Sequence, residues 1–173
     1  MSKSLAPLDQ LRAGVEQLQL ELNETQLEQM LSYLQAMLAE NQHINVTAIR
    51  ELPAAITQHL LDSLTLVQAW HHHCGEQPPR RVLDLGTGGG FPAAVLACAW
   101  PTAHVLAIDG TGKKIGVVTR CAAQAGLQNL EAKQIRGNDL ARTEPTALHS
   151  FDLSTARAVG PALKLLKELA PLT

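Results

Sequence analysis

Apolar residues recur at helical spacing through the first part of the chain. One stripe follows Asn23, whose side chain has a Gln partner three residues on, the pattern of a helix N-cap with its capping box. This stripe consists of Leu27, Leu31, Leu34 and Leu38. A second stripe follows Pro53 and consists of Ile56, Leu60, Leu64 and Val67. We expect both stripes to be the buried faces of helices.

The pattern changes after the run Gly75-Glu76-Gln77-Pro78-Pro79, which is typical of a boundary. Beyond it, short apolar segments alternate with helical ones. Strands are predicted at 82–85, 104–109, 130–135 and 151–155, and helices at about 92–100, 113–125 and 163–169. Gly126 is expected to cap the C-terminus of the second of these helices. Such alternation is typical of a mostly parallel, doubly wound α/β sheet of the Rossmann-like kind. We therefore predict an N-terminal helical segment, residues 1–75, beside a Rossmann-like domain, residues 80–173.

Composition narrows the class of protein. Hydrophobic residues make up 46% of the chain, enough for a core, but no apolar run approaches the roughly 20 residues of a membrane span. The start of the chain lacks the features of a signal peptide. Three widely spaced cysteines fit neither a disulfide framework nor a zinc site, and the adjacent histidines 71–73 point in different directions on a helix. We expect a cytoplasmic protein without a membrane anchor or a metal.

Charge is distributed unevenly. Residues 1–79 carry a net charge of −6 and residues 80–173 a net charge of +4. A basic face on the second segment would suit a nucleic acid, although ordinary solvated charge explains the difference about as well. If the face exists, we expect it to gather Lys113, Lys114, Arg120, Arg136 and Arg157, with the acidic segment turned away.

The segment Asp84-Leu85-Gly86-Thr87-Gly88-Gly89-Gly90 is the main candidate for a ligand site. Gly86, Gly88 and Gly90 let the backbone turn sharply and lie directly against a ligand. The bulky Phe91 stands where a dinucleotide-binding loop has its third glycine, although a frame shifted by two residues satisfies that pattern. Asp84 before the loop would repel a pyrophosphate but suits the ammonium group of a methionine moiety. These details favour S-adenosylmethionine over NAD.

Two further residues lie at the ends of predicted strands. Asp109 ends the second strand, 23 residues after Gly86, where a carboxylate can accept hydrogen bonds from both ribose hydroxyls. Arg157 follows the fourth strand and suits a carboxylate of the cofactor or a phosphate of a nucleic acid. It is also our candidate for a substrate-side residue, and an arginine that merely caps a helix end is the alternative.

Four motifs in order resemble one known family, the ribosomal RNA small subunit methyltransferase G (glucose-inhibited division protein B) family, over roughly residues 15–165. These motifs are Asn45-Val46-Thr47-Ala48-Ile49-Arg50, His59-Leu60-Leu61-Asp62-Ser63-Leu64, the loop from Asp84 to Pro92, and Ala156-Arg157-Ala158-Val159. The chain departs from the family pattern at Glu40-Asn41, Gln58, Val95 and Gly110.

The resemblance implies S-adenosylmethionine-dependent methylation of a guanine N7 in small-subunit (16S) ribosomal RNA, as naked RNA or in a ribosomal particle. The cofactor contacts that it implies are Gly86, Phe91, Asp109, the pair Gly137-Asn138, and Arg157. The family's sheet continues for two or three more strands, so we expect a chain that lacks those C-terminal strands. The alternatives are a cofactor-binding module without turnover and a methyltransferase that acts on a small molecule or protein. A dehydrogenase is a more distant alternative.

Overall fold

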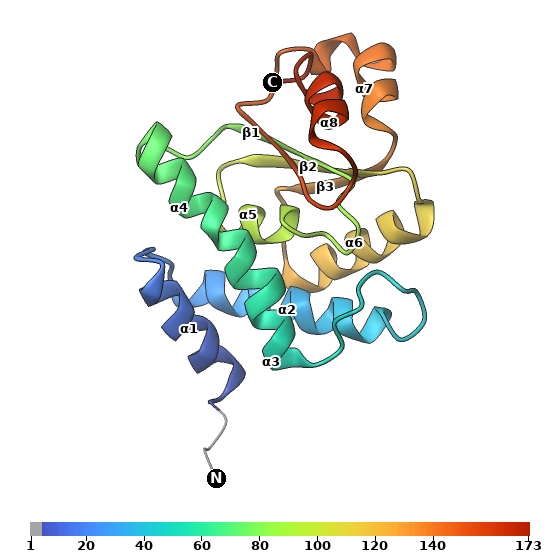
Figure 1. Ribbon diagram of the computed structural model, residues 1–173. Helices are drawn as coiled ribbons and strands as arrows, with labels where there is room; N and C mark the ends of the chain where they lie inside the picture. The colour runs from blue at the N-terminus through green and yellow to red at the C-terminus, as the bar shows by residue number, and fades with distance from the viewer. Residues whose placement is uncertain (1–4) are drawn as a thin grey trace.

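The computed structural model describes residues 5–173, and its first half is helical (Figure 1). The N-terminal segment contains α1 (Pro7–Gln17), α2 (Glu24–Glu40), α3 (Leu52–Ala55), a π-helical turn η1 (Ile56–Leu61) and α4 (Asp62–Cys74). The last three run on from one another as a single long rod. Both apolar stripes read from the sequence lie on these helices, and most of their residues are buried.

The capping box predicted at Asn23 is present at the start of α2. The Asn23 side chain accepts the backbone N–H of Gln26, and the Gln26 side chain accepts the backbone N–H of Asn23. The same Gln26 amide donates to the carbonyls of Cys98 and Ala99 at the end of α5 (Ala93–Ala99). Gln26 therefore caps α2 and also bonds the N-terminal segment to the second half of the chain.

The second half of the chain builds a four-stranded parallel sheet. Its strands are β1 (Arg81–Leu85), β2 (His104–Asp109), β3 (Leu130–Gln134) and β4 (Leu153–Ala156), in the order β3-β2-β1-β4. The order reverses between β1 and β4, and in such sheets ligands bind beyond the carboxyl ends of the strands near this switch point. The glycine loop follows β1 at that point.

Helices cover both faces of the sheet (Figure 1). One face carries α5 and α6 (Gly112–Ala125), and the other carries α7 (Gly137–Thr143) and α8 (Ala162–Leu169). Alternate strand residues divide between the two cores, since Val82 and Val105 belong to the first and Leu83 and Leu106 to the second. The prediction of a doubly wound α/β sheet is confirmed.

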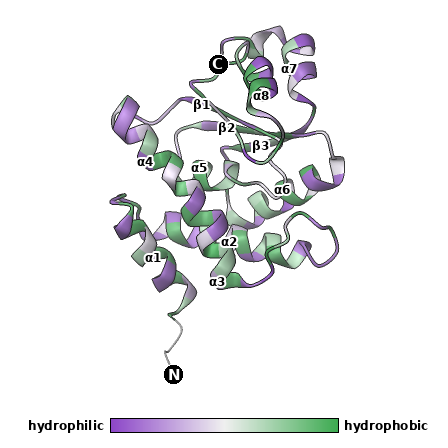
Figure 2. Ribbon diagram, viewed as in Figure 1, coloured by the Kyte–Doolittle hydropathy of each residue, from purple (hydrophilic) through white to green (hydrophobic). Residues whose placement is uncertain are grey.

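The N-terminal helices pack on α5 and α6 and extend the first core (Figure 2). All seven residues of α5 are buried because the helix lies between the sheet and the N-terminal helices. One continuous hydrophobic cluster runs from Leu11 to Leu130. The boundary between residues 1–75 and 80–173 therefore crosses a shared core, and its position stays a prediction.

Three elements differ from expectation. The fourth strand covers Leu153–Ala156 instead of 151–155, because Phe151 precedes the ladder and donates its N–H to the Leu172 carbonyl. The helix after the glycine loop begins at Ala93, with Pro92 as its N-cap. Helix α7 was not predicted, because its seven residues carry too short an apolar pattern to read.

Across residues 5–173, none of the helices combines the length and apolarity that crossing a bilayer requires. The same residues bring no three metal-ligating side chains together. The three cysteines are free, with Cys98 and Cys121 buried and Cys74 exposed.

Candidate cofactor site

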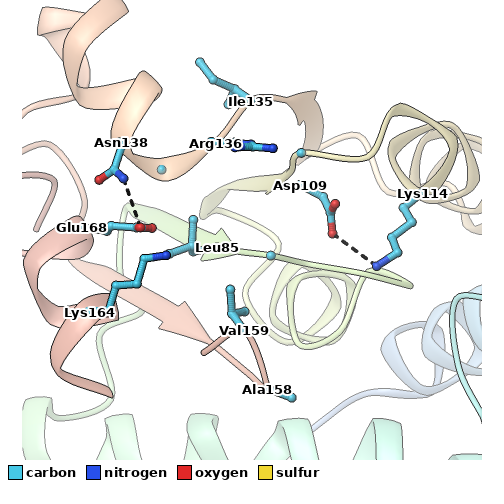
Figure 3. A pocket seen from close by; sticks show the side chains of 13 residues that line it. Leu85, Asp109, Lys114, Ile135, Arg136, Asn138, Ala158, Val159, Lys164 and Glu168 are labelled. Atoms are coloured by element: carbon cyan, nitrogen blue, oxygen red, sulfur yellow. Dashed lines mark hydrogen bonds and ion pairs between the residues drawn. The ribbon is translucent and has the colours of Figure 1, made fainter. Parts of the chain in front are cut away.

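A pocket of about 460 Å³ opens at the carboxyl ends of the strands (Figure 3). Its volume lies within the range of roughly 300–1,000 Å³ that small-ligand pockets occupy. The segments after all four strands contribute to it, together with the first turns of α6 and α7 and one face of α8. The lining residues are Leu85, Gly86, Asp109, Gly110, Lys114, Ile135, Arg136, Gly137, Asn138, Ala158, Val159, Lys164 and Glu168.

The backbone of the glycine loop forms one wall of this pocket. Gly86 has a φ of +72°, which a residue with a Cβ adopts only at a cost. A Cβ at this position would also lie 2.5 Å from Cγ2 of Val159. The chain after β4 therefore packs directly onto the glycine loop, and only glycine fits at position 86 beneath Val159.

Asp109 presents a carboxylate at the end of β2 and remains 9% exposed. Its Oδ1 accepts the Thr111 N–H at 2.8 Å, and its Oδ2 accepts the Gly88 N–H at 3.2 Å. Lys114 lies 3.9 Å from Oδ2 (Figure 3). A carboxylate with two backbone donors is fixed in direction and keeps lone pairs for a ligand's hydroxyl groups.

Asp84 lies beneath the loop instead of in the pocket wall. Its side chain is 1% exposed, and its Oδ1 accepts the hydroxyl of Thr155 at 2.8 Å. In the described part of the chain, Oδ2 of Asp84 and the buried hydroxyl of Thr87 have no hydrogen-bond partner. Burial raises the pKa of Asp84, and the hydroxyl groups beside it oppose that shift. The Thr87 hydroxyl and the Ala93 N–H act on this carboxylate from within the chain, so the unpaired oxygen does not by itself require a donor from outside.

Gly137 and Asn138 form the opposite end of the pocket, at the start of α7. A Cβ on Gly137 would lie 2.8 Å from Cδ1 of Leu85, so the turn sits tightly against the end of β1. The Asn138 amide donates to Oε1 of Glu168 at 3.2 Å (Figure 3). Helix α8 is thereby joined to the turn that leads into α7.

The other glycines of the loop and Phe91 face away from the pocket. Gly88 donates to Asp109, and Gly90, with a φ of +91°, lies directly against the Tyr33 hydroxyl. That hydroxyl donates to the Gly89 carbonyl at 3.1 Å. The Phe91 ring is 5% exposed and packs edge-on against Tyr33. These residues shape the loop from below.

Arg157 also lies outside the pocket and is turned toward the N-terminal segment. Its Nη1 donates to Oδ2 of Asp62 at 2.7 Å and to the Gln58 carbonyl at 3.3 Å. The structure thus brings Gly86, Asp109, Gly137 and Asn138 together in one pocket. The other predicted residues do not line this pocket, and they are Asp84, Gly88, Gly90, Phe91 and Arg157.

The expectation that the acidic segment faces away from the basic residues is wrong. Arg120 donates to both carboxylate oxygens of Glu40 at 2.7 Å, and Arg157 pairs with Asp62. Both carboxylates belong to the N-terminal segment, which packs on α6 and beside the end of β4. The reason is geometric, since the helices that bury their apolar faces against the domain also bring their acidic side chains to its cations.

Sequence reasoning missed Lys164 and Glu168, which line the pocket from α8. They stand four residues apart and so occupy one face of that helix. Their four-residue spacing is visible in the sequence, but it does not show which face of α8 lies at the pocket. Val159 belongs to the fourth family motif, and no role was predicted for it. In the structure it lies over Gly86.

The fold is that of a Rossmann-like α/β protein with a pocket at the carboxyl ends of its parallel strands. The chain resembles the crystal structure of coclaurine N-methyltransferase bound to N-methylheliamine and SAH, with a TM-score of 0.50 and 16% sequence identity, over 96% of this chain and 53% of that one. This likeness concerns the fold.

The family follows from sequence. The family model of rRNA small subunit methyltransferase G matches residues 26–173. Relatives named ribosomal RNA small subunit methyltransferase G occur in Acinetobacter baylyi, Halorhodospira halophila and Syntrophotalea carbinolica, at 32%, 34% and 38% identity. The matches cover 95%, 92% and 88% of this chain and 73%, 70% and 67% of those proteins. The chain belongs to the rRNA small subunit methyltransferase G family.

Proposed function

We propose that this chain transfers a methyl group from S-adenosylmethionine to N7 of a guanine in small-subunit ribosomal RNA. The observation that carries the proposal is the pocket at the switch point of the sheet, in a chain of this family. The backbone at Gly86 lines this pocket, and Asp109 offers a carboxylate beside it that two backbone N–H groups hold in place.

The pocket residues fit the parts of the cofactor in order along the sheet. Asp109, which ends β2 and lines the pocket, would accept the ribose hydroxyls. Gly137 and Asn138, after β3, would hold the base, while the glycine loop would hold the methionine moiety. The unpartnered oxygen of Asp84 would accept the ammonium group, directly or through a water. When bound, the cofactor supplies a methyl group on a positively charged sulfur.

Methylation at N7 requires that the guanine and the methyl donor are positioned correctly, and it does not require a general base. Guanine N7 carries a lone pair in the plane of the ring and no proton, so it can attack the methyl group in line. Holding the two reactants in this geometry by itself supplies a large part of the rate acceleration. Arg157, directly after β4, stays the candidate for the substrate side, and in the free chain its guanidinium is bonded to Asp62 and to the Gln58 carbonyl.

The RNA side of the proposal rests on cations around the pocket. Lys114, Arg136 and Lys164 line it, and these side chains suit the phosphates of an RNA strand. We propose the small-subunit RNA, free or in a ribosomal particle, as the partner, and the cytoplasm as the compartment.

The test is a methyl-transfer assay with mapping of the product. Small-subunit RNA from a strain without this gene is incubated with the protein and labelled S-adenosylmethionine, and N7-methylguanine is mapped by cleavage at the modified base. We expect label at a guanine that is methylated in the parent strain and unmethylated in the deletion strain. Methylation that persists at the same guanines in the deletion strain would overturn the RNA assignment.

A calorimetric titration tests the cofactor separately. We expect micromolar binding of S-adenosylmethionine or S-adenosylhomocysteine and no binding of NAD. Binding of NAD in preference to both would return the chain to the dehydrogenase class.

A further inference from the structure

Arg157 is held by the N-terminal segment on the side away from the cofactor pocket. Its Nη1 is bonded to Asp62, at the first position of α4, and to the Gln58 carbonyl. Its Nη2 lies 3.4 Å from Nδ1 of His59. Three residues within about one turn of the η1–α4 helix, Gln58, His59 and Asp62, therefore surround one guanidinium group.

His59 links this arginine to the loop before the rod. Because Nδ1 faces a cation that has no lone pair to offer, it must be the acceptor, and Nε2–H then donates to the Thr47 hydroxyl at 2.9 Å. The imidazole is 7% exposed and stacks on the Phe91 ring, with centroids 4.8 Å apart and planes at 8°. The ring is therefore fixed on three sides, and it is neutral.

The loop that receives His59 is itself ordered by a buried side chain. Asn41, 3% exposed, accepts the N–H groups of Val46 and Thr47 and donates to the Thr47 carbonyl at 3.0 Å. The Thr47 hydroxyl also accepts the Ile49 N–H. A hydrogen-bonded path thus runs from Asn41 through Thr47 and His59 to Arg157.

The residues that follow Arg157 form a wall of the cofactor pocket. Ala158 has a φ of +55°, a conformation that costs a residue with a Cβ about 1 kcal/mol or more. Val159 lies over Gly86. Because such a turn persists only where its surroundings hold it, the bonds to Arg157 on one side and the contact with Gly86 on the other determine its shape.

We propose that His59 and Asp62 are positioning residues, which fix Arg157 and, through it, hold the Ala158–Val159 turn against the glycine loop. The N-terminal segment then completes the cofactor pocket instead of merely lying beside the domain. This inference rests on the proposed cofactor site for its functional consequence, while the anchoring itself is a property of the free chain.

Two substitutions at one position separate the polar contacts from the packing. His59→Phe keeps an aromatic ring to stack on Phe91 but loses both hydrogen bonds. His59→Gln has an acceptor and a donor and can keep both. Asp62→Ala removes the ion pair with Arg157, and Asp9→Ala removes a comparable exposed ion pair, with Arg12 on α1, as the control.

The first readout is amide hydrogen exchange of the free protein. We expect His59→Phe and Asp62→Ala to speed exchange at residues 157–160 by about tenfold, the factor that corresponds to one hydrogen bond to a charged group. His59→Gln and Asp9→Ala should exchange as the parent does. Unchanged exchange at 157–160 in both His59→Phe and Asp62→Ala would overturn the proposal.

The second readout is calorimetric binding of S-adenosylhomocysteine. His59→Phe and Asp62→Ala should bind about tenfold more weakly at an unfolding temperature close to that of the parent, with His59→Gln restoring the affinity. Equal affinity across all four variants would overturn the coupling to the pocket. A parent protein that binds no S-adenosylhomocysteine would overturn the proposed function, and the exchange result would still decide the anchoring.

Discussion

Carboxylates at the ends of β1 and β2 hold the glycine loop from two directions. Asp109 accepts the Gly88 N–H, and the buried Asp84 accepts the Thr155 hydroxyl from the neighbouring strand. Each acidic group thereby ties the loop to a strand beside it. The sequence predicted a ligand at the same two positions, and for Asp84 and Asp109 that role stays a prediction.

Replacing Asp109 tests this combination. In Asp109→Ala the ligand's hydroxyl groups would lose their acceptor, so binding of S-adenosylhomocysteine should weaken by about 1–3 kcal/mol. Calorimetry measures the change, with Asp9→Ala as the control for loss of a carboxylate elsewhere. An affinity equal to that of the parent would remove Asp109 from the site.

His59 makes stability depend on pH. Burial and the positive charge of Arg157 lower the pKa of His59 to about 4 from its ordinary value of 6.5. The unfolded chain therefore binds a proton below pH 6.5 that the folded chain refuses until about pH 4. The contribution of His59 is complete above pH 6.5 and is lost as the pH falls through this window.

In His59→Gln this loss should be absent. Urea unfolding at several pH values between 6.5 and 4 should show a shallower decline than in the parent, by at most about 1.4 kcal/mol per pH unit. Parallel declines for the two proteins would mean that His59 is protonated in the folded state. Exposed carboxylates contribute equally to both proteins and cancel in the comparison.

At the scale of elements, helix termini set much of the architecture. The capping box at Asn23 begins α2, and Gly126, with a φ of +71°, ends α6 in the left-handed conformation that glycine favours. Both were predicted, because a cap depends on residues within a few positions of one another. The short α7 and the exact start of β4 were not, because their boundaries depend on contacts with distant residues.

The cap of α2 gives a prediction for this scale. Asn23→Ala removes the acceptor for the Gln26 N–H and should lower the free energy of unfolding by about 1 kcal/mol. Chemical denaturation measures the change, and Asn23→Asp, which keeps an acceptor, serves as the matched variant. If Asn23→Ala were as stable as Asn23→Asp, solvent would be satisfying the end of the helix.

At the scale of the whole molecule, the two segments share one core. Leu34 on α2 is fully buried in the cluster that also contains Val82 and Val105 of the sheet. Leu83 is buried on the opposite face, in the cluster with Phe151 and Leu172. Since only the sheet lies between these clusters and contributes residues to both, unfolding of one face should expose the other.

We therefore expect a single unfolding transition. Leu34→Ala and Leu83→Ala should each lower the free energy of unfolding by about 2–5 kcal/mol and shift the same transition. Far-ultraviolet circular dichroism and calorimetry should report coincident curves. Two separate transitions, with Leu34→Ala moving only one, would instead show that residues 1–75 unfold independently.

The sequence by itself determined the fold class, the two helical stripes that follow Asn23 and Pro53, and the position of the glycine loop. Each of these follows from local chemistry: apolar spacing for the elements, Asn23 and Gly126 for their ends, and glycines beside strand-end acids for the loop. The resemblance added the family, which the family match confirms. The assignment of individual residues to the cofactor stays a prediction.

Tertiary structure alone decided which of these residues meet. It gathered Gly86, Asp109, Gly137 and Asn138 in one pocket and turned Arg157 toward Asp62 and His59. It also brought the acidic segment to the basic residues and placed Lys164 and Glu168 at the pocket. The physical reason is that these contacts join residues up to about a hundred positions apart in the sequence. Such contacts depend on how helices pack against a sheet, and no local pattern in the chain records that.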